Sequence, residues 1–344
     1  MSYKSYRALI MLAVLLLAGI LPLTSVASEE VNIYSARQEN LIKPLLDRFT
    51  QETGISVNLV TGDADALLKR LELEGANSPA DILITTDAGR LHRARTAGVT
   101  QAFGSTIMTE TVPSRFRDPD GHWIGLTVRA RPIMYVQGKV DPGTLSTYEA
   151  LSEKQWKGRI CIRSSGNIYN QSLVASLIAA NGEAATEQWA KGFVKNFARP
   201  PRGGDRDQIK AAAAGQCDLA IANTYYLAGM LTSKDAAQRA AAEQMGVFWP
   251  NQADRGTHMN ISGATITRAA KNKDNAIRLL EFLLNKESQA WYAATNGEYP
   301  VRADVPASEL LRSWGDFKQD TLNLGRLGEL NPEALRLMDR VGWK

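Results

Sequence analysis

Apolar positions follow two alternating periods along the first part of the chain. Strand-like runs at residues 31–34, 55–60 and 82–85 are separated by stretches with helical spacing of apolar residues at 41–49 and 65–74. The run at 82–85 is typical of a parallel strand that is buried on both faces. Strands and helices that alternate in this way predict a parallel sheet covered by helices.

A second α/β region follows the turn at Asp141-Pro142-Gly143. Beginning with the strand that precedes this turn, we expect strands at 126–136, 159–163, 217–222, 247–249 and 261–267. We expect helices at 171–180 and 184–196, a helix ending at 211–214, and helices at 276–284, at 288–294 and from 308 onward. The predicted fold class is therefore α/β, with two lobes built by a chain that crosses between them. A cleft between two lobes is a common ligand site.

The N-terminal segment, residues 1–27, has the pattern of a secretory signal peptide. Lys4 and Arg7 precede the apolar run Ala8–Leu23, and small residues follow at Ser25–Ala27. We therefore expect an exported protein whose mature form starts near Ser28. An uncleaved membrane anchor is the alternative.

Length and charge limit the classes of function. The chain has 344 residues, enough for two domains. Its 40 basic and 36 acidic residues give a formal net charge of +4, which favours neither nucleic acid nor a membrane surface as a partner. We expect no nucleic-acid binding.

Two cysteines, Cys161 and Cys217, each lie in a predicted strand in the same half of the chain. In an exported protein a disulfide between them is chemically plausible. Two free buried thiols are the alternative, and the sequence does not decide between them.

Tyrosines follow two of the predicted strands. Tyr225 and Tyr226 come after strand 217–222, and Tyr169 comes after strand 159–163. Open α/β sheets bind ligands at the carboxyl ends of their strands. Phenols titrate near pH 10, so they bind as phenolates only with strong electrostatic help, which a hard trivalent cation supplies. The pattern predicts a ferric iron site, with ordinary aromatic packing as the alternative.

Residues of the first lobe are suited to an accompanying anion. Arg37, Gln38 and Glu39 follow strand 31–34, and Arg129 lies on the strand expected to link the lobes. Arg and Gln together suit a small oxyanion such as carbonate, which would complete the coordination of the metal. In the alternative interpretation Arg37 caps the sheet edge and Arg129 forms an ion pair between the lobes.

Motifs of enzymes are incomplete. Ser164-Ser165-Gly166 lacks the G-x-S-x-G pattern of a nucleophilic serine, and Gly203–Asp207 lacks the ending of a phosphate-binding loop. The sequence therefore predicts a protein that is not an enzyme.

Several runs resemble the periplasmic ferric-iron-binding proteins of ABC importers over nearly the whole mature chain. These runs are Ile33–Gln38, Ser78–Asp81, Trp156–Ile160, Asn167–Leu173, Ala222–Tyr226, Asn251–His258 and Asn296–Val301. The resemblance implies a two-lobe, type II-like periplasmic-binding-protein fold with hinge strands crossing between the lobes. It also implies that Tyr169, Tyr225 and Tyr226 bind iron.

One departure from the family concerns Gln38 and Glu39, where many relatives have a His, or a His followed by Tyr. The pair Arg37-Gln38 instead resembles the branch that uses three tyrosines and a carbonate-type synergistic anion, with Arg129 as a further anion contact. Glu39 as a direct metal ligand is the alternative.

The resemblance further implies a monomer in the periplasm that delivers ferric iron to an ABC permease in the inner membrane. We expect an N-terminal lobe from 28–128 plus about 257–303 and a C-terminal lobe from 129–256 plus about 304–344. A binding protein of the same fold for an organic or phosphonate solute, with stacking tyrosines, is the alternative function.

Overall fold

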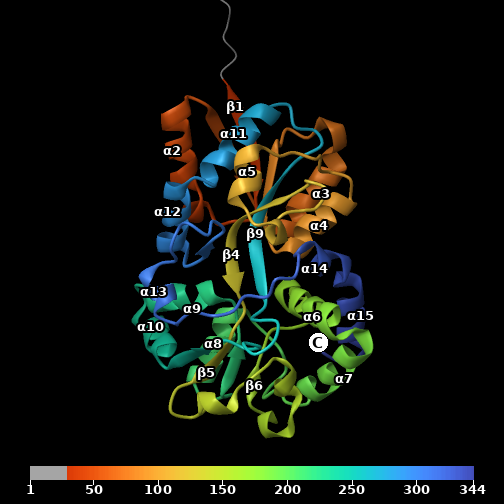
Figure 1. Cartoon of the computed structure of the whole chain (residues 1–344), viewed down its shortest axis with the longest axis vertical. Helices are drawn as coiled ribbons and strands as arrows, with labels where there is room; N and C mark the ends of the chain where they lie inside the picture. The colour runs from red at the N-terminus through yellow and green to blue at the C-terminus, as the bar shows by residue number, and fades with distance from the viewer. Residues whose placement is uncertain (1–28) are drawn as a thin grey trace, which may run out of the picture.

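The computed structural model describes residues 29–344, so the predicted signal peptide lies outside the described residues. Two α/β lobes are stacked along the long axis of the molecule, and helices surround a sheet in each lobe (Figure 1). This arrangement confirms the predicted two-lobe α/β class.

The sheet of the upper lobe has six strands in the order β10-β4-β9-β3-β1-β2. Its strands are β1 (Glu30–Ser35), β2 (Ser56–Thr61), β3 (Ile82–Thr86), β4 (Ile124–Ala130), β9 (Met259–Ile266) and β10 (Tyr299–Pro300). β1 is parallel to β2 and β3, whereas β9 is antiparallel to β3 and β4. The three strands predicted near the N-terminus are confirmed.

The sheet of the lower lobe has four strands in the order β6-β7-β5-β8. These are β5 (Ile133–Val136), β6 (Ile160–Cys161), β7 (Leu219–Ile221) and β8 (Met245–Phe248). β6 and β7 are parallel neighbours, so the segments that follow them begin at the same edge of the sheet. Both segments carry the predicted tyrosines.

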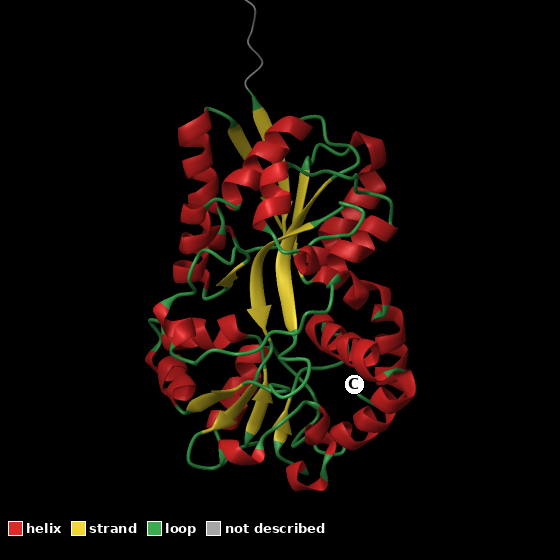
Figure 2. Ribbon diagram, in the orientation of Figure 1, coloured by secondary structure: helices red, strands yellow, loops and turns green. Residues whose placement is uncertain are grey.

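The prediction of one strand over 126–136 was wrong. β4 ends at Ala130 in the upper sheet and β5 begins at Ile133 in the lower sheet. Pro132 lies between them, and its missing N–H and the restriction on the residue before it interrupt strand pairing. The chain therefore crosses between the lobes here. It crosses again between β8 and β9, and Figure 2 shows β4 and β9 as long strands running toward the lower lobe.

Four helices of the upper lobe match the predicted spacing: α2 (Lys43–Thr53), α3 (Ala64–Glu74), α11 (Lys273–Leu283) and α12 (Lys286–Asn296). The lobe also contains α4 (Ala88–Thr96) and α5 (Thr106–Thr111). α2 buries Leu45, Leu46 and Phe49, and Gly54 ends it with a φ of 74° that glycine adopts readily.

Helices of the lower lobe and the C-terminal segment are α6 (Ile168–Asn181), α7 (Glu183–Val194), α8 (Asp205–Ala213), α9 (Thr224–Leu231), α10 (Ala236–Glu243), α13 (Glu309–Arg312), α14 (Gly325–Glu329) and α15 (Asn331–Arg340). Short 3₁₀ helices occur at Glu39–Leu41, Gly75–Asn77, Ser114–Phe116, Pro142–Thr144, Glu149–Ser152 and Lys154–Trp156. The C-terminal segment is helical only in part. Its residues 313–324 return to the upper lobe, where Leu324 N donates to Arg115 O at 3.0 Å.

The C-terminal helices α14 and α15 lie beside α6 (Figure 1). α14 also packs against α4 of the upper lobe, so the end of the chain contacts both lobes. The residue boundaries predicted for the lobes stay a prediction.

A disulfide joins Cys161 at the end of β6 to Cys217 just before β7, with 5.9 Å between the two Cα atoms. The sequence left open whether these two cysteines are bonded or are free buried thiols, and the structure shows them bonded. The bond ties together the two strands that precede the predicted tyrosines.

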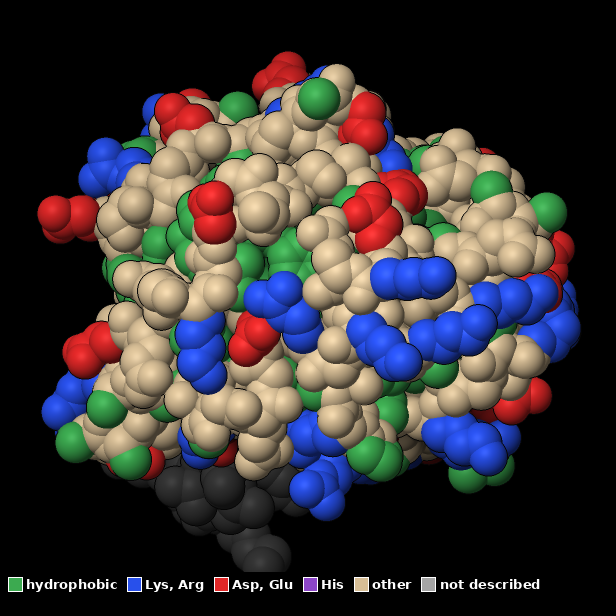
Figure 3. Space-filling view, turned by 90° about the horizontal axis from the view of Figure 1, so that it is seen from below, with side chains coloured by type: hydrophobic (Ala, Val, Ile, Leu, Met, Phe, Trp, Pro, Cys, Tyr) green, Lys and Arg blue, Asp and Glu red, His purple; other side chains and the backbone are tan. Residues whose placement is uncertain are grey.

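The outer end of the lower lobe is polar. Figure 3, which views the molecule from below, shows Lys and Arg side chains gathered over one half of this face, with scattered acidic and apolar side chains. Within residues 29–344 no helix is long and apolar enough to cross a membrane.

Candidate metal centre

The structure brings the three predicted tyrosines together at two helix N-termini. Tyr169 lies in the first turn of α6, and Tyr225 and Tyr226 lie in the first turn of α9. The Tyr225 hydroxyl donates to the Tyr169 hydroxyl at 3.2 Å, and the rings of Tyr225 and Tyr226 have centroids 4.3 Å apart. Because helix N-termini carry a partial positive charge, they favour the ionised form of nearby phenols.

Arginines surround the tyrosine rings. The guanidinium carbon of Arg129 lies 5.4 Å from the ring centroid of Tyr225, and that of Arg206 lies 5.1 Å from the centroid of Tyr226. Two more arginines, Arg131 and Arg163, stand 6.0 and 5.9 Å from the ring of Tyr169. The positive charges of these arginines stabilise the ionised, phenolate form of the tyrosines over the neutral phenol.

Burial opposes ionisation of the same phenols. It raises the pKa of Tyr225 well above its usual value, and the neighbouring Tyr169 and Tyr226 raise it further, against a lowering by Arg129. Burial also raises the pKa of Tyr226, helped by Tyr169 and Asp205. Without a bound cation these groups are therefore neutral at neutral pH. A metal ion would have to displace their protons.

A buried arginine holds the two helix N-termini in place. Arg131 donates to Asp205 Oδ1 at 2.9 Å, to Asn223 Oδ1 at 2.9 Å and to Asn170 Oδ1 at 2.7 Å. Asn170 follows Tyr169, and Asn223 is the N-cap residue of α9. Sequence reasoning missed this role of Arg131, although the unusual run Arg129-Ala130-Arg131-Pro132 was visible.

The predicted anion-binding arginines share one carboxylate. Arg37 pairs through Nη2 with Glu298 Oε2, and Arg129 Nη2 lies 3.4 Å from Glu298 Oε1 and donates to Ser262 Oγ. Burial would raise the pKa of Glu298, but Arg37 and Arg129 hold it below its usual value. Arg129 does form an ion pair, and its partner Glu298 directly precedes β10, which pairs with β4 in the upper sheet.

Sequence reasoning did not assign a role to Glu298. It lies between α12 and the short strand β10, and no pattern in the sequence shows that this segment returns to β4.

The other two candidate anion or metal ligands of the upper lobe lie apart from the contacts of Arg37 and Arg129 with Glu298. Gln38 and Glu39 are exposed in the turn after β1, and within the described chain neither side chain forms a hydrogen bond or an ion pair. The structure therefore groups Arg37 and Arg129 but does not bring Gln38 or Glu39 into hydrogen-bond contact with them.

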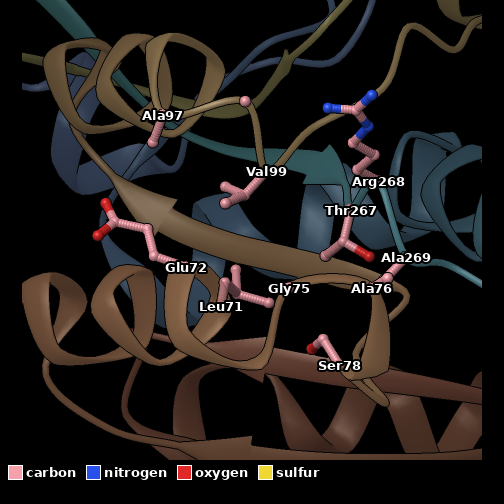
Figure 4. A pocket seen from close by; sticks show the side chains of 11 residues that line it. Leu71, Glu72, Gly75, Ala76, Ser78, Ala97, Val99, Thr267, Arg268 and Ala269 are labelled. Carbon is pink, nitrogen blue, oxygen red and sulfur yellow. The ribbon is translucent and has the colours of Figure 1, made fainter.

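A separate cavity of about 610 Å³ lies in the upper lobe. Figure 4 shows Leu71 and Val99 in its middle, with the charged ends of Glu72 and Arg268 on opposite sides. None of the residues predicted to bind metal or anion lines it.

Comparison with known proteins establishes the family. A model described as bacterial extracellular solute-binding protein matches residues 45–319. The chain belongs to this family. Solute-binding proteins of this kind are not enzymes, as the sequence predicted.

Individual relatives are similar over most of this chain. Iron uptake protein A1 of Synechocystis is 52% identical over 316 residues, which cover 92% of this chain and 88% of the relative. The structure of the Trichodesmium protein IdiA (FutA) in complex with iron and citrate ligands is 50% identical, with a TM-score of 0.90, and covers 92% of this chain and 100% of its own. The structure of apo FutA2 from Synechocystis is 45% identical, with a TM-score of 0.88 and coverage of 92% and 100%. These similarities confirm the predicted resemblance to ferric-iron-binding proteins.

Proposed function

We propose that the protein captures ferric iron between its lobes in the periplasm and delivers it to an ABC permease in the inner membrane. The observation that carries the proposal is the contact of 3.2 Å between the hydroxyls of Tyr225 and Tyr169, with Tyr226 packed beside them. Relatives named as iron uptake and ferric-binding proteins support it.

In this proposal Tyr169, Tyr225 and Tyr226 bind the iron as phenolates. Three phenolates balance the charge of a ferric ion, and hard oxygen donors match a hard cation. The helix N-termini and the arginines around the rings stabilise the ionised ligands. The metal ion displaces the protons of the phenols, and these protons are released to solvent.

A synergistic anion such as carbonate completes the coordination. Arg129 is the main candidate to hold it, because its Nε and Nη1 atoms are buried without a hydrogen-bond partner in the described chain. Arg37 and Gln38 are the further anion contacts of the proposal, and Glu39 is an additional candidate ligand for the metal.

Closure of the lobes over iron is a shift between open and closed populations. The metal stabilises the closed arrangement because only there do both lobes contact the iron and its anion. We propose the lobes to be residues 28–128 with about 257–303, and 129–256 with about 304–344, and the working form to be a monomer.

The test is titration of the purified mature protein with ferric nitrilotriacetate, followed by metal analysis. We expect stoichiometric iron and a visible phenolate-to-iron charge-transfer band. A protein that binds an organic or phosphonate solute through stacking tyrosines would retain no stoichiometric iron, and that result would refute the proposal.

A further inference from the structure

The upper lobe touches the helix that carries Tyr225 and Tyr226 at a glycine. Gly297 ends α12, and a Cβ atom built on it would lie 2.7 Å from the Ala228 Cβ and 3.8 Å from the Tyr225 Cα, both on α9 of the lower lobe. Figure 1 shows α12 above α9 on the same side of the molecule. We propose that Gly297 is a positioning residue, whose missing side chain lets the lobes close far enough to complete the iron site. This inference rests on the proposed function, since it concerns closure over the metal.

The space between Gly297 and α9 is smaller than one methyl group. Carbon atoms that are not bonded attract each other best at about 3.5–4.0 Å, so a contact of 2.7 Å would force the two residues apart by about 1 Å. The contact would join two Cβ atoms, which are fixed to the backbone and cannot turn aside like the end of a long side chain. A methyl group on Gly297 therefore has to displace backbone.

The segment around Gly297 is held on both sides within the upper lobe. Before it, Asn296 Nδ2 donates to Leu41 O at 3.1 Å. After it, the side chain of Glu298 forms buried ion pairs, and β10 pairs with β4 of the same sheet. The segment therefore has little freedom to yield within its own lobe.

Helix α9 is held in the lower lobe. Its N-cap residue Asn223 accepts from the buried Arg131, and the helix packs against α8 and α10. Ala228 is 2% exposed and lies three residues after Tyr225, on the same face of the helix. A methyl group on Gly297 is therefore accommodated by separation of the two lobes.

A second glycine of the upper lobe lies against the helix of Tyr169. A Cβ atom built on Gly89 would lie 3.4 Å from Ile168 Cδ1 and 3.7 Å from Ser172 Oγ, both on α6. The first of these atoms is the end of a side chain that can shift, and the second distance is an ordinary contact. The contact at Gly297 is the tighter one and therefore limits how far the lobes close.

Closure brings charged groups of the upper lobe to the tyrosines. Arg129 belongs to β4 of the upper lobe, and its guanidinium carbon lies 5.4 Å from the ring centroid of Tyr225. The three proposed iron ligands, in contrast, all belong to the lower lobe. Separation of the lobes would therefore leave the phenolates on the iron but withdraw Arg129 and the anion that it holds. Iron should still bind with its colour, but it should leave faster.

The experiment follows iron loss from the loaded protein to an excess of chelator, by the decay of the phenolate-to-iron band. We expect Gly297→Ala to show the band and to lose iron about tenfold faster than the wild type, an effect in the range of one overpacked methyl group. An unchanged rate would overturn the inference. If Gly297→Ala does not fold, Gly297→Asn carries the same Cβ atom on a residue that tolerates positive φ, and the same two outcomes apply.

The matched control is Gly54→Ala. Gly54 ends α2 of the same lobe with a φ of 74°, close to the 61° of Gly297, so both substitutions strain the backbone alike. Among residues 29–344, a Cβ atom built on Gly54 would meet nothing within 4 Å beyond its chain neighbours. Gly54→Ala should lose iron at the wild-type rate. An equal increase in both variants would contradict the inference.

Removal of the opposing methyl group should restore slow iron loss. Ala228→Gly takes away the Cβ atom that Gly297→Ala would meet. In the Ala228→Gly background, Gly297→Ala should therefore change the rate of iron loss by less than about threefold. An increase as large as that in the wild-type background would show that the effect does not come from this contact, and the inference would fail.

Failure of the proposed function gives a different result. If iron produced no phenolate band in any variant, the metal assignment would fail, and small-angle X-ray scattering of the iron-free proteins would test the contact between the lobes. Gly297→Ala should then have a larger radius of gyration than Gly54→Ala. Equal radii would overturn the inference.

Discussion

The hydroxyl of Tyr225 donates a hydrogen bond to the hydroxyl of Tyr169 at 3.2 Å, although the two residues are 56 positions apart in the chain. The contact joins the first turn of α9 to the first turn of α6. It exists because β6 and β7 are parallel neighbours, so the helices that follow them start at one edge of the sheet. In the proposed function this geometry places phenol oxygens around one ion.

Iron affinity should fall as the pH is lowered. Burial first, and then the neighbouring phenols, raise the pKa of Tyr225, so the phenol is protonated throughout the range from pH 5.5 to 8 and must lose its proton when iron binds. With all three phenols as ligands, about three protons are released per iron. Proton release measured by pH-stat during loading checks this number. Loading without proton release, after correction for the chelator, would contradict the ligand set.

Substitution Asp205→Asn should destabilise the protein and weaken iron binding together. Asp205 is fully buried and pairs with Arg131 at 2.9 Å and Arg163 at 2.8 Å, and the loss of its charge leaves the buried Arg131 and the partly exposed Arg163 with less compensation. Removal of one partner of a buried ion pair costs about 3 kcal/mol. Denaturant unfolding and iron titration measure the two effects.

The matched control for this substitution is Asp316→Asn, at an exposed position whose side chain forms no hydrogen bond or ion pair within the described chain. Equal stability of the two variants would show that the contacts of Arg131 do not hold the tyrosine helices in place.

Substitution Ser172→Ala should weaken a contact between α4 and α6. Ser172 Oγ donates to Asp87 Oδ1 at 2.7 Å, and Asp87 is the N-cap residue of α4 in the upper lobe. Burial raises the pKa of Asp87, and the loss of a donor leaves its carboxyl less satisfied. A lost hydrogen bond to a buried charged group costs about 2 kcal/mol.

The control is Ser176→Ala on the same helix. Ser176 is also buried, but within residues 29–344 its hydroxyl donates only to Leu173 O of its own helix. Denaturant unfolding should show a larger loss of stability for Ser172→Ala. A loss no larger than that of Ser176→Ala would contradict a stabilising role for the contact between the helices.

Removal of the disulfide should lower the stability of the protein but spare the iron site. Cys161 and Cys217 are separated by 56 positions, and a closed loop of that length stabilises by about 4 kcal/mol in the chain-entropy model. We expect the double substitution to alanine to unfold at lower denaturant concentration and to keep the phenolate band. Loss of the band in the folded variant would show that the bond positions the tyrosines.

Much of the fold could be predicted from local patterns. Helix α2 and the strands β1 to β3 follow directly from the spacing of apolar residues. The tyrosines were found because each follows a predicted strand. Their convergence depends on the parallel pairing of β6 and β7, which the structure shows.

Other features depend on long-range contacts that no local pattern encodes. The break between β4 and β5 is marked only by Pro132 within an otherwise strand-like run. Glu298 reaches Arg37 and Arg129 because β10 pairs with β4, and β10 has only two residues. The partners of Arg131 come from three separate segments of the chain, so its place became visible only in three dimensions.

The most direct test of the iron site is a crystal structure of the protein loaded with ferric iron, with the metal located by anomalous scattering. The account predicts the iron in the cleft between the lobes, in bonding contact with the phenolic oxygens of Tyr169, Tyr225 and Tyr226. Iron bound elsewhere, or an occupied cleft with those three rings turned away from the metal, would contradict it.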